Sequence, residues 1–300
     1  MKAVIRTFLR YKKSANLRAG SDYNAKMNPI IAYFAQLSRQ LSMKGWITEL
    51  WGKTTVFRLP SSKGQGRVIF YVHGGSFTAP TSPAHFRFCN ELAREVQAEV
   101  YIIEYDLAPD VKYPAIHDQC REMITTIVNS RGDYSEIILA GDSAGAGILP
   151  AIFNKLEPEI ASQVKASLLI SPWLDYDGSS LSAKTREQLD PWLNSRGVEP
   201  VALLYFDNIE NIAMAQASMR ISLDDQPPTF ISVGEAEILF SDSIELFATL
   251  LNNGVLASIY VGRSLWHVWP LFPISERRHL LAEVASFLEI LESPNSKFHQ

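Results

Sequence analysis

A serine flanked by glycines stands in the run Gly-Asp-Ser-Ala-Gly at residues 141–145. The β-rich run 135–141 leads into it and a helical pattern follows, which predicts a sharp strand-to-helix turn rather than an ordinary helix start. Gly141 and Gly145 suit such a turn because larger side chains there would clash on either side of the serine. The turn would present the Ser143 hydroxyl at a helix N-terminus, where unpaired N–H groups favour negative charge. Ser143 is therefore the candidate nucleophile.

A serine hydroxyl needs a base to accept its proton, and the chain has six histidines. His267 follows the strand-like run 256–262 and precedes the helical pattern 275–293. In folds with a nucleophile turn of this kind the base comes last, on a loop after the final strand. His267 is therefore the candidate base, although its neighbours Trp266 and Trp269 also suit a structural histidine.

The base in turn needs a carboxylate that fixes its tautomer and stabilises the imidazolium. This acid should follow a strand between the serine and the histidine, where the run FISVGEAEILFSDS carries several acidic residues. Glu237 is our choice for the acid and Asp242 is the second choice. Glu235 remains a third candidate because it lies nearest the strand end. The predicted chain order is then Ser143, Glu237, His267.

Negative charge that develops on a substrate carbonyl oxygen needs preorganised N–H donors. The run YVHGGSF puts Gly74 and Gly75 directly after a strand, about 70 residues before the nucleophile turn. Glycines there would let backbone N–H groups approach a substrate closely. Ala144, next to the serine, would supply another donor, and His73 is expected to shape the loop rather than act as a base.

The overall composition narrows the classes of protein. The chain has 300 residues, is 47% hydrophobic and has a formal net charge of -4, so it can bury a large core and has no basic surplus typical of a nucleic-acid binder. No apolar run reaches the length of a membrane-spanning helix, and no signal-peptide pattern opens the chain. Cys89 and Cys120 show no metal-ligand spacing and are expected to be free buried thiols. A cytoplasmic location follows as the default expectation.

Apolar strand-like runs alternate with helical patterns from about residue 67 onward. This alternation predicts an α/β fold in which helices cover both faces of a mostly parallel central sheet. Residues 47–60 suggest an antiparallel strand or hairpin at the sheet edge. Residues 1–45 are expected to form an N-terminal helical cap segment, and 46–300 the catalytic domain, with a helical cap insertion at about 175–223.

Six motifs occur in an order that is familiar. They are YVHGGSF, EYDLAPDVKYPAIHDQ, LAGDSAGAG, LLISPWLD, PPTFISVGEAEIL and WHVWPLF. In this order they resemble the hormone-sensitive-lipase-like branch of the α/β-hydrolases, which contains many bacterial carboxylesterases. The resemblance covers roughly residues 45–292. It implies an α/β-hydrolase fold, hydrolysis of small to medium acyl esters through an acyl-enzyme, no metal and no organic cofactor. Dimerisation with a second copy of the chain is a possible assembly.

Carried over by position, the family's nucleophile falls on Ser143, its base on His267, its acid on Glu237 and its oxyanion donors on Gly74, Gly75 and Ala144. One departure is Ser76, which stands where the family has a third glycine, so its side chain could narrow or polarise the site. An acyltransferase or an amidase with the same triad is the alternative function, and a non-catalytic ligand receptor is a further one. Aromatic residues that could line an apolar pocket, or equally pack in the core, are Phe77, Phe86, Trp192, Tyr205, Phe206, Trp266 and Trp269.

Overall fold

The structure is a computed structural model, and it describes residues 2–3, 5–6, 9–10, 44–61, 66–132, 134–221 and 223–292. Most of the expected N-terminal cap segment, residues 1–45, therefore lies outside the described residues. Within the described part of the chain, no helix combines the length and the apolar character needed to cross a bilayer.

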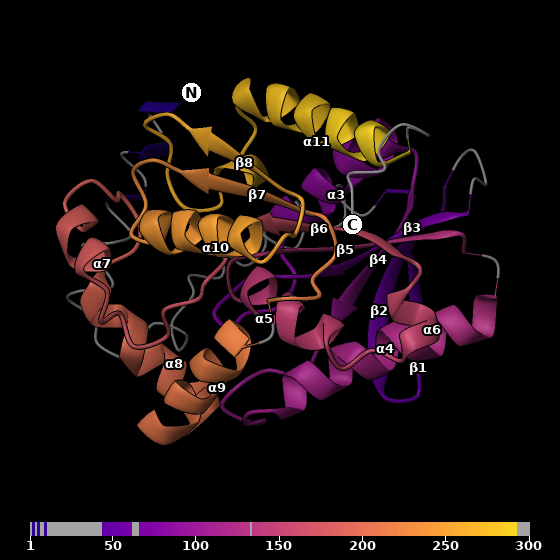
Figure 1. The fold of residues 1–300 in the computed structure, drawn as a ribbon, viewed down its shortest axis with the longest axis horizontal. Coiled ribbons are helices and arrows are strands. Elements are labelled where there is room, and N and C mark those ends of the chain that lie inside the picture. Colours follow the sequence, from indigo (N-terminus) through magenta and orange to yellow (C-terminus); the bar gives the residue numbers. More distant parts are fainter. Residues whose placement is uncertain are drawn as a thin grey trace.

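An eight-stranded sheet forms the centre of the molecule, in the order β1-β2-β4-β3-β5-β6-β7-β8 (Figure 1). The edge pair β1 and β2 is antiparallel, and β2 also runs antiparallel to β4, whereas every later pair is parallel. Both the mostly parallel sheet and the predicted antiparallel edge are confirmed. The strands are β1 (Ile47–Trp51), β2 (Thr54–Leu59), β3 (Arg67–Val72), β4 (Glu99–Glu104), β5 (Glu136–Asp142), β6 (Val164–Ile170), β7 (Thr229–Gly234) and β8 (Ala257–Gly262).

Helices cover both faces of this sheet, as the alternating sequence pattern predicts. Figure 1 shows α11, with α3 near it, above the sheet in that view, and α4 and α6 below it. The helices are α3 (Pro83–Val96), α4 (Ala115–Arg131), α5 (Ser143–Phe153), α6 (Pro158–Ala161), α7 (Leu181–Arg186), α8 (Val198–Phe206), α9 (Ile209–Ile221), α10 (Phe240–Asn252) and α11 (Glu276–Glu292), with short 3-10 turns η2 (Ser195–Gly197) and η3 (Trp269–Leu271).

Strand β3 shows why the sheet must be covered on both sides. Val68, Phe70 and Val72 belong to the buried cluster under α4 and α5, while Ile69 and Tyr71 belong to the cluster under α3 and α11. Successive side chains of a strand point to opposite faces, so a continuous apolar run such as this one needs two apolar layers. Cys89 and Cys120 are free and buried in these layers, as expected.

The chain between β6 and β7 leaves the sheet and forms α7, η2, α8 and α9. These helices lie together at the lower left of Figure 1, where α9 contacts α5 and α7 contacts α10. The insertion spans the region that the sequence assigns to a cap at about 175–223. Through the contact of α9 with α5, the insertion packs beside the helix that begins with the candidate nucleophile.

Candidate active site

The predicted strand-to-helix turn is present at the end of β5. Ser143 is the first residue of α5 and has a φ of 51°, in the left-handed region that residues other than glycine seldom adopt. A Cβ on Gly141 would lie 2.6 Å from the Val72 carbonyl oxygen, and one on Gly145 would lie 2.0 Å from the same atom. Both positions therefore require glycine, because β3 passes directly behind the turn.

The structure brings together Ser143 at the start of α5, Glu237 after β7 and His267 after β8. His267 Nε2 lies 2.9 Å from Ser143 Oγ, and His267 Nδ1 lies 2.6 Å from Glu237 Oε2. All three side chains are buried, and Glu237 is fully so. If Nδ1–H donates to the carboxylate, the Nε2 lone pair faces the serine hydroxyl and can accept its proton.

Of the three candidate acids, only Glu237 is hydrogen-bonded to the imidazole in the described part of the chain. Glu235 is exposed, and its Oε2 accepts the Ser264 N–H at 2.8 Å. Asp242 lies in the first turn of α10. The two-residue step from Glu235 to Glu237 turns the chain from the sheet end back toward the imidazole.

Ser171 connects the acid to the loop of the base, and the sequence analysis did not single it out. It follows β6, is fully buried, and its Oγ donates to Glu237 Oε1 at 2.8 Å. Ser171 Oγ also accepts the N–H of Val268, the neighbour of His267, at 3.1 Å. The signal that could have found it is a polar residue at the carboxyl end of a parallel strand, in the motif LLISPWLD.

A second buried carboxylate, Asp142, lies behind the nucleophile. Its Oδ1 accepts the Tyr71 hydroxyl and the Gly74 N–H, both at 2.9 Å, and His85 Nε2 lies 3.4 Å from its Oδ2. His85 Nδ1 accepts the Ser82 N–H at 2.9 Å, so the ring proton is on Nε2 and points to the carboxylate. Burial by itself raises the pKa of Asp142, but His85 and these hydrogen bonds outweigh it and lower the pKa.

The Gly74 N–H is therefore engaged by the Asp142 carboxylate, which disfavours the prediction that it donates to an oxyanion. A Cβ at Gly74 would lie 2.3 Å from Asp142 Oδ2, so glycine is needed there to let the loop approach this carboxylate. Ala144 is the second residue of α5, whose N–H has no partner within its own helix. Within the described chain, the N–H groups of Gly75 and Ser76 donate to no other residue.

The loop that carries these N–H groups has an unusual backbone. Gly75, Ser76 and Phe77 all have positive φ, at 120°, 55° and 63°. The Phe77 ring is fully buried, with its centroid 4.5 Å from that of Tyr205, and its carbonyl accepts the Ala108 N–H at 2.9 Å. This anchoring holds Ser76 in a conformation that glycine adopts more easily.

His73 shapes the same loop from beneath. Its ring stacks on Tyr105 at 4.2 Å, and its Nδ1 is 2.8 Å from the Gly74 carbonyl oxygen. The Tyr105 hydroxyl donates to the His73 carbonyl at 2.8 Å. Burial, together with the neighbouring His85, lowers the pKa of His73 to about 4, so the ring is neutral at pH 7.

The insertion is tied to the acid by Asp190, which the sequence analysis also missed. Its carboxylate accepts the N–H groups of Trp192 at 2.8 Å, Leu193 at 2.9 Å and Ile238 at 3.0 Å. Burial raises the pKa of Asp190, and these hydrogen bonds oppose the rise. Because Ile238 follows the acid, this carboxylate fixes Trp192 with its ring 5.8 Å from that of His267.

Most of the aromatic residues proposed as pocket lining pack in the core instead. Trp192 is half-buried beside His267, whereas the other six are almost fully buried. Those six are Phe77, Phe86, Tyr205, Phe206, Trp266 and Trp269.

A family model described as alpha/beta hydrolase fold matches residues 69–271, which hold Ser143, Glu237 and His267. The match covers more than half of the chain.

Among curated proteins, the chain is 26% identical over 229 residues to an esterase of Acinetobacter venetianus, covering 75% of this chain and 76% of the relative. It is 25% identical over 241 residues to an acetyl-hydrolase of Streptomyces hygroscopicus, covering 79% and 80%. Among solved structures, an esterase from the bacterial hormone-sensitive lipase family superposes with a TM-score of 0.78 at 23% identity, covering 97% and 98%. The expected fold is confirmed, and the comparisons agree with the resemblance drawn from the motifs.

Proposed function

Because the chain belongs to the alpha/beta hydrolase fold family, and its buried serine faces a carboxylate-bound imidazole, we propose that it is a serine carboxylesterase. The proposed substrates are small to medium acyl esters. Relatives named esterase and acetyl-hydrolase support ester hydrolysis. The observation that carries the proposal is the hydrogen-bonded chain Ser143–His267–Glu237.

In the first half of the proposed cycle, Ser143 Oγ attacks the ester carbonyl carbon while His267 Nε2 takes its proton. Glu237 stabilises the imidazolium through the Nδ1 hydrogen bond. His267 then gives the proton to the leaving alkoxide, so the ester C–O bond breaks and an acyl-enzyme remains on Ser143. In the second half, His267 takes a proton from water as the water oxygen attacks the acyl carbon. His267 then returns this proton to Ser143 Oγ as the bond between the acyl carbon and Oγ breaks, which releases the acid and restores the serine.

The tetrahedral intermediates need N–H donors for their oxyanion. The sequence-based set was Gly74, Gly75 and Ala144. With Gly74 bonded to Asp142, we propose Gly75, Ser76 and Ala144 as the donors. A serine serves at position 76 in this role because the donor is its backbone N–H, and the left-handed conformation that glycine prefers is held by the buried ring of Phe77.

Hydrolysis of a p-nitrophenyl ester series, from acetate to palmitate, tests the proposal. We expect the wild type to turn over the shorter esters and Ser143→Ala to lose at least about 10³-fold in kcat, since a residual contribution from the oxyanion donors can survive. Turnover by Ser143→Ala at a rate close to that of the wild type would contradict the proposal. The circular dichroism spectrum and Tm of the variant control for folding.

The same preparation distinguishes the alternative functions. An anilide of the best acyl group tests amidase activity, and a competing alcohol tests acyl transfer by the ratio of new ester to free acid. Amide cleavage that exceeds ester cleavage, or transfer that exceeds hydrolysis in dilute alcohol, would favour the amidase or the acyltransferase. A folded wild type that turns over none of these substrates would favour a ligand receptor.

A further inference from the structure

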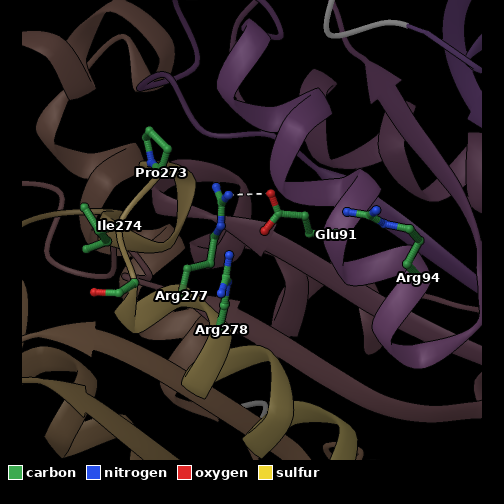
Figure 2. Close-up of a pocket in the computed structure, with 7 residues that line it drawn as sticks. Glu91, Arg94, Pro273, Ile274, Arg277 and Arg278 are labelled. Atoms are coloured by element: carbon green, nitrogen blue, oxygen red, sulfur yellow. Dashed lines mark hydrogen bonds and ion pairs between the residues drawn. The ribbon is translucent and has the colours of Figure 1, made fainter. Parts of the chain in front are cut away.

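A pocket of about 520 Å³ lies between α3 and the start of α11, and none of the three candidate triad residues lines it. Glu91 and Arg94 come from α3, and Arg277 and Arg278 come from the first turn of α11. Figure 2 shows the side chains from the two helices pointing toward one another across this space. Ser275 contributes to the rim.

The charges in this pocket do not balance. Three arginines face one carboxylate, Glu91, which is bonded to Arg277 Nη2. Glu276, the acidic residue next to Arg277 in the chain, is paired with Lys2. Arg94 and Arg278 are exposed at the pocket, so an anion can reach their guanidinium groups from solvent.

Arg277 carries the strongest sign of a missing partner. The residue is only 7% exposed, and its Nε and Nη1 are buried without a hydrogen-bond partner among the described residues. A buried charged donor without an acceptor is costly, because it has lost water without gaining a replacement. A single hydrogen bond to Glu91 leaves most of the donor capacity of this guanidinium unused.

The surplus of positive charge extends beyond the pocket wall. Arg87, one turn before Glu91 on α3, has its pKa lowered by burial and by the nearby charge of Arg277, while Glu91 opposes the shift. Two arginines thus repel each other inside the α3–α11 layer. A bound anion would relieve this repulsion and supply acceptors to the same groups.

We propose that this pocket binds a small molecule through a phosphate group. A phosphate monoester carries up to two charges and at least three acceptor oxygens, so it can engage several guanidinium groups at once, which a monocarboxylate with two oxygens does less well. The volume is in the range of small-molecule sites, which leaves room for more than the phosphate itself. The organic part of the ligand would lie against Pro273 and Ile274.

Calorimetric titration of the full chain with inorganic phosphate tests the proposal directly. The buffer is phosphate-free and potassium chloride holds the ionic strength constant, because surface charge effects vary with salt. Glycerol phosphate and acetate are titrated in parallel. We expect one saturable site for phosphate, equal or tighter binding of the monoester, and much weaker binding of acetate.

The test variant is Arg94→Gln combined with Arg278→Gln. Both side chains are exposed, so this variant should fold, whereas substitution of the buried Arg277 risks the core. The matched control is Arg121→Gln combined with Arg263→Gln, which removes the same charge outside the pocket. We expect the Kd for phosphate to rise at least about tenfold in the test variant, since hydrogen bonds to charged groups are each worth roughly 1.4 kcal/mol or more, and to stay near the wild-type value in the control.

Absence of saturable phosphate binding to the wild type would overturn the proposal, and so would an equal loss of affinity in the two double variants. Acetate binding as tight as phosphate would replace the phosphate assignment by a carboxylate site. None of these readouts uses ester hydrolysis, so a failure here is distinct from a failure of the proposed carboxylesterase function.

Discussion

Two buried charged groups in this molecule are partnered very differently. The Glu237 carboxylate accepts the Ser171 hydroxyl at 2.8 Å, the Gly234 N–H at 2.5 Å and the His267 imidazole at 2.6 Å. Arg277 donates to one carboxylate, that of Glu91, and its other two guanidinium nitrogens have no partner among the described residues. The first group is complete within the chain, so it can hold an imidazole in one orientation. The second is incomplete within the described residues, which points to a partner from outside.

The acid at the complete site offers the largest effect. Glu237→Gln keeps the size of the side chain but replaces a carboxylate by an amide, which can favour the wrong tautomer of His267 and cannot stabilise the imidazolium. We expect kcat for the best p-nitrophenyl ester to fall by about 10⁴-fold, measured under substrate saturation. The matched control is Glu235→Gln, which lies outside the hydrogen-bonded chain. A larger loss in Glu235→Gln than in Glu237→Gln would contradict the assignment of the acid.

Removal of a positioning group should cost less. Ser171→Ala deletes the hydroxyl that joins Glu237 to the Val268 N–H and leaves both groups one hydrogen bond short. We expect a loss of about 10- to 100-fold in kcat with little change in KM, because the imidazole moves while substrate contacts stay.

Ser232→Ala is the control for Ser171→Ala, since Ser232 is also buried and its Oγ has no hydrogen-bond partner in the part of the chain that the structure describes. It should leave kcat within about twofold of the wild type, because no hydrogen bond is lost. If Ser171→Ala raises KM and leaves kcat unchanged, the hydroxyl acts on substrate binding and not on the position of the base.

At the incomplete site around Arg277, a substitution should change the stability of the protein. Glu91→Gln removes the one carboxylate bonded to Arg277, and we expect the free energy of unfolding to fall by about 1–3 kcal/mol, less than for a fully buried pair because Glu91 is partly exposed. Urea denaturation measures the change. Phosphate should then raise the Tm of Glu91→Gln more than that of the wild type. An equal rise in both proteins would mean that the anion acts elsewhere.

The pH dependence of stability tests the two buried histidines, His73 and His117. Burial lowers the pKa of His73 to about 4 and that of His117 to about 3, from 6.5. Below pH 6.5 the unfolded chain binds protons on these histidines that the folded chain does not bind. The contribution of the neutral histidines to the free energy of unfolding is therefore complete above pH 6.5 and falls as the pH drops toward 4. Each histidine contributes about 1.4 kcal/mol per pH unit in this window. His117→Gln should reduce the slope of unfolding free energy against pH by that amount, and an unchanged slope would contradict it.

The sequence predicted the features that short-range chemistry dictates. Gly141 and Gly145 indicate the turn in the sequence, because a Cβ at either position would clash with the backbone of β3. The sheet and its helical layers follow from apolar strands such as β3, which need cover on both faces. The sequence favours Glu237 over two neighbouring acids as the partner of the base, and the hydrogen bond of Glu237 to the imidazole agrees with this prediction.

The sequence did not predict the hydrogen bonds that Gly74, Ser171 and Asp190 make with distant parts of the chain. The hydrogen bond from the Gly74 N–H to Asp142 joins two residues that are 68 positions apart. It occupies an N–H group that the local sequence pattern offers as an oxyanion donor. Ser171 and Asp190 act through backbone N–H groups of other loops, which no spacing reveals. The cytoplasmic location, the dimer and the role of residues 1–45 stay predictions.

Covalent labelling of the nucleophile tests the central claim most directly. The wild type, Ser143→Ala and Glu237→Gln are incubated with a p-nitrophenyl dialkyl phosphate, and intact-protein mass spectrometry with peptide mapping locates the adduct. The predicted result is one adduct per chain on Ser143, formed much more slowly in Glu237→Gln and absent in Ser143→Ala. A stoichiometric adduct on another residue, or unchanged labelling of Ser143→Ala, would contradict the assignment of Ser143 as the nucleophile.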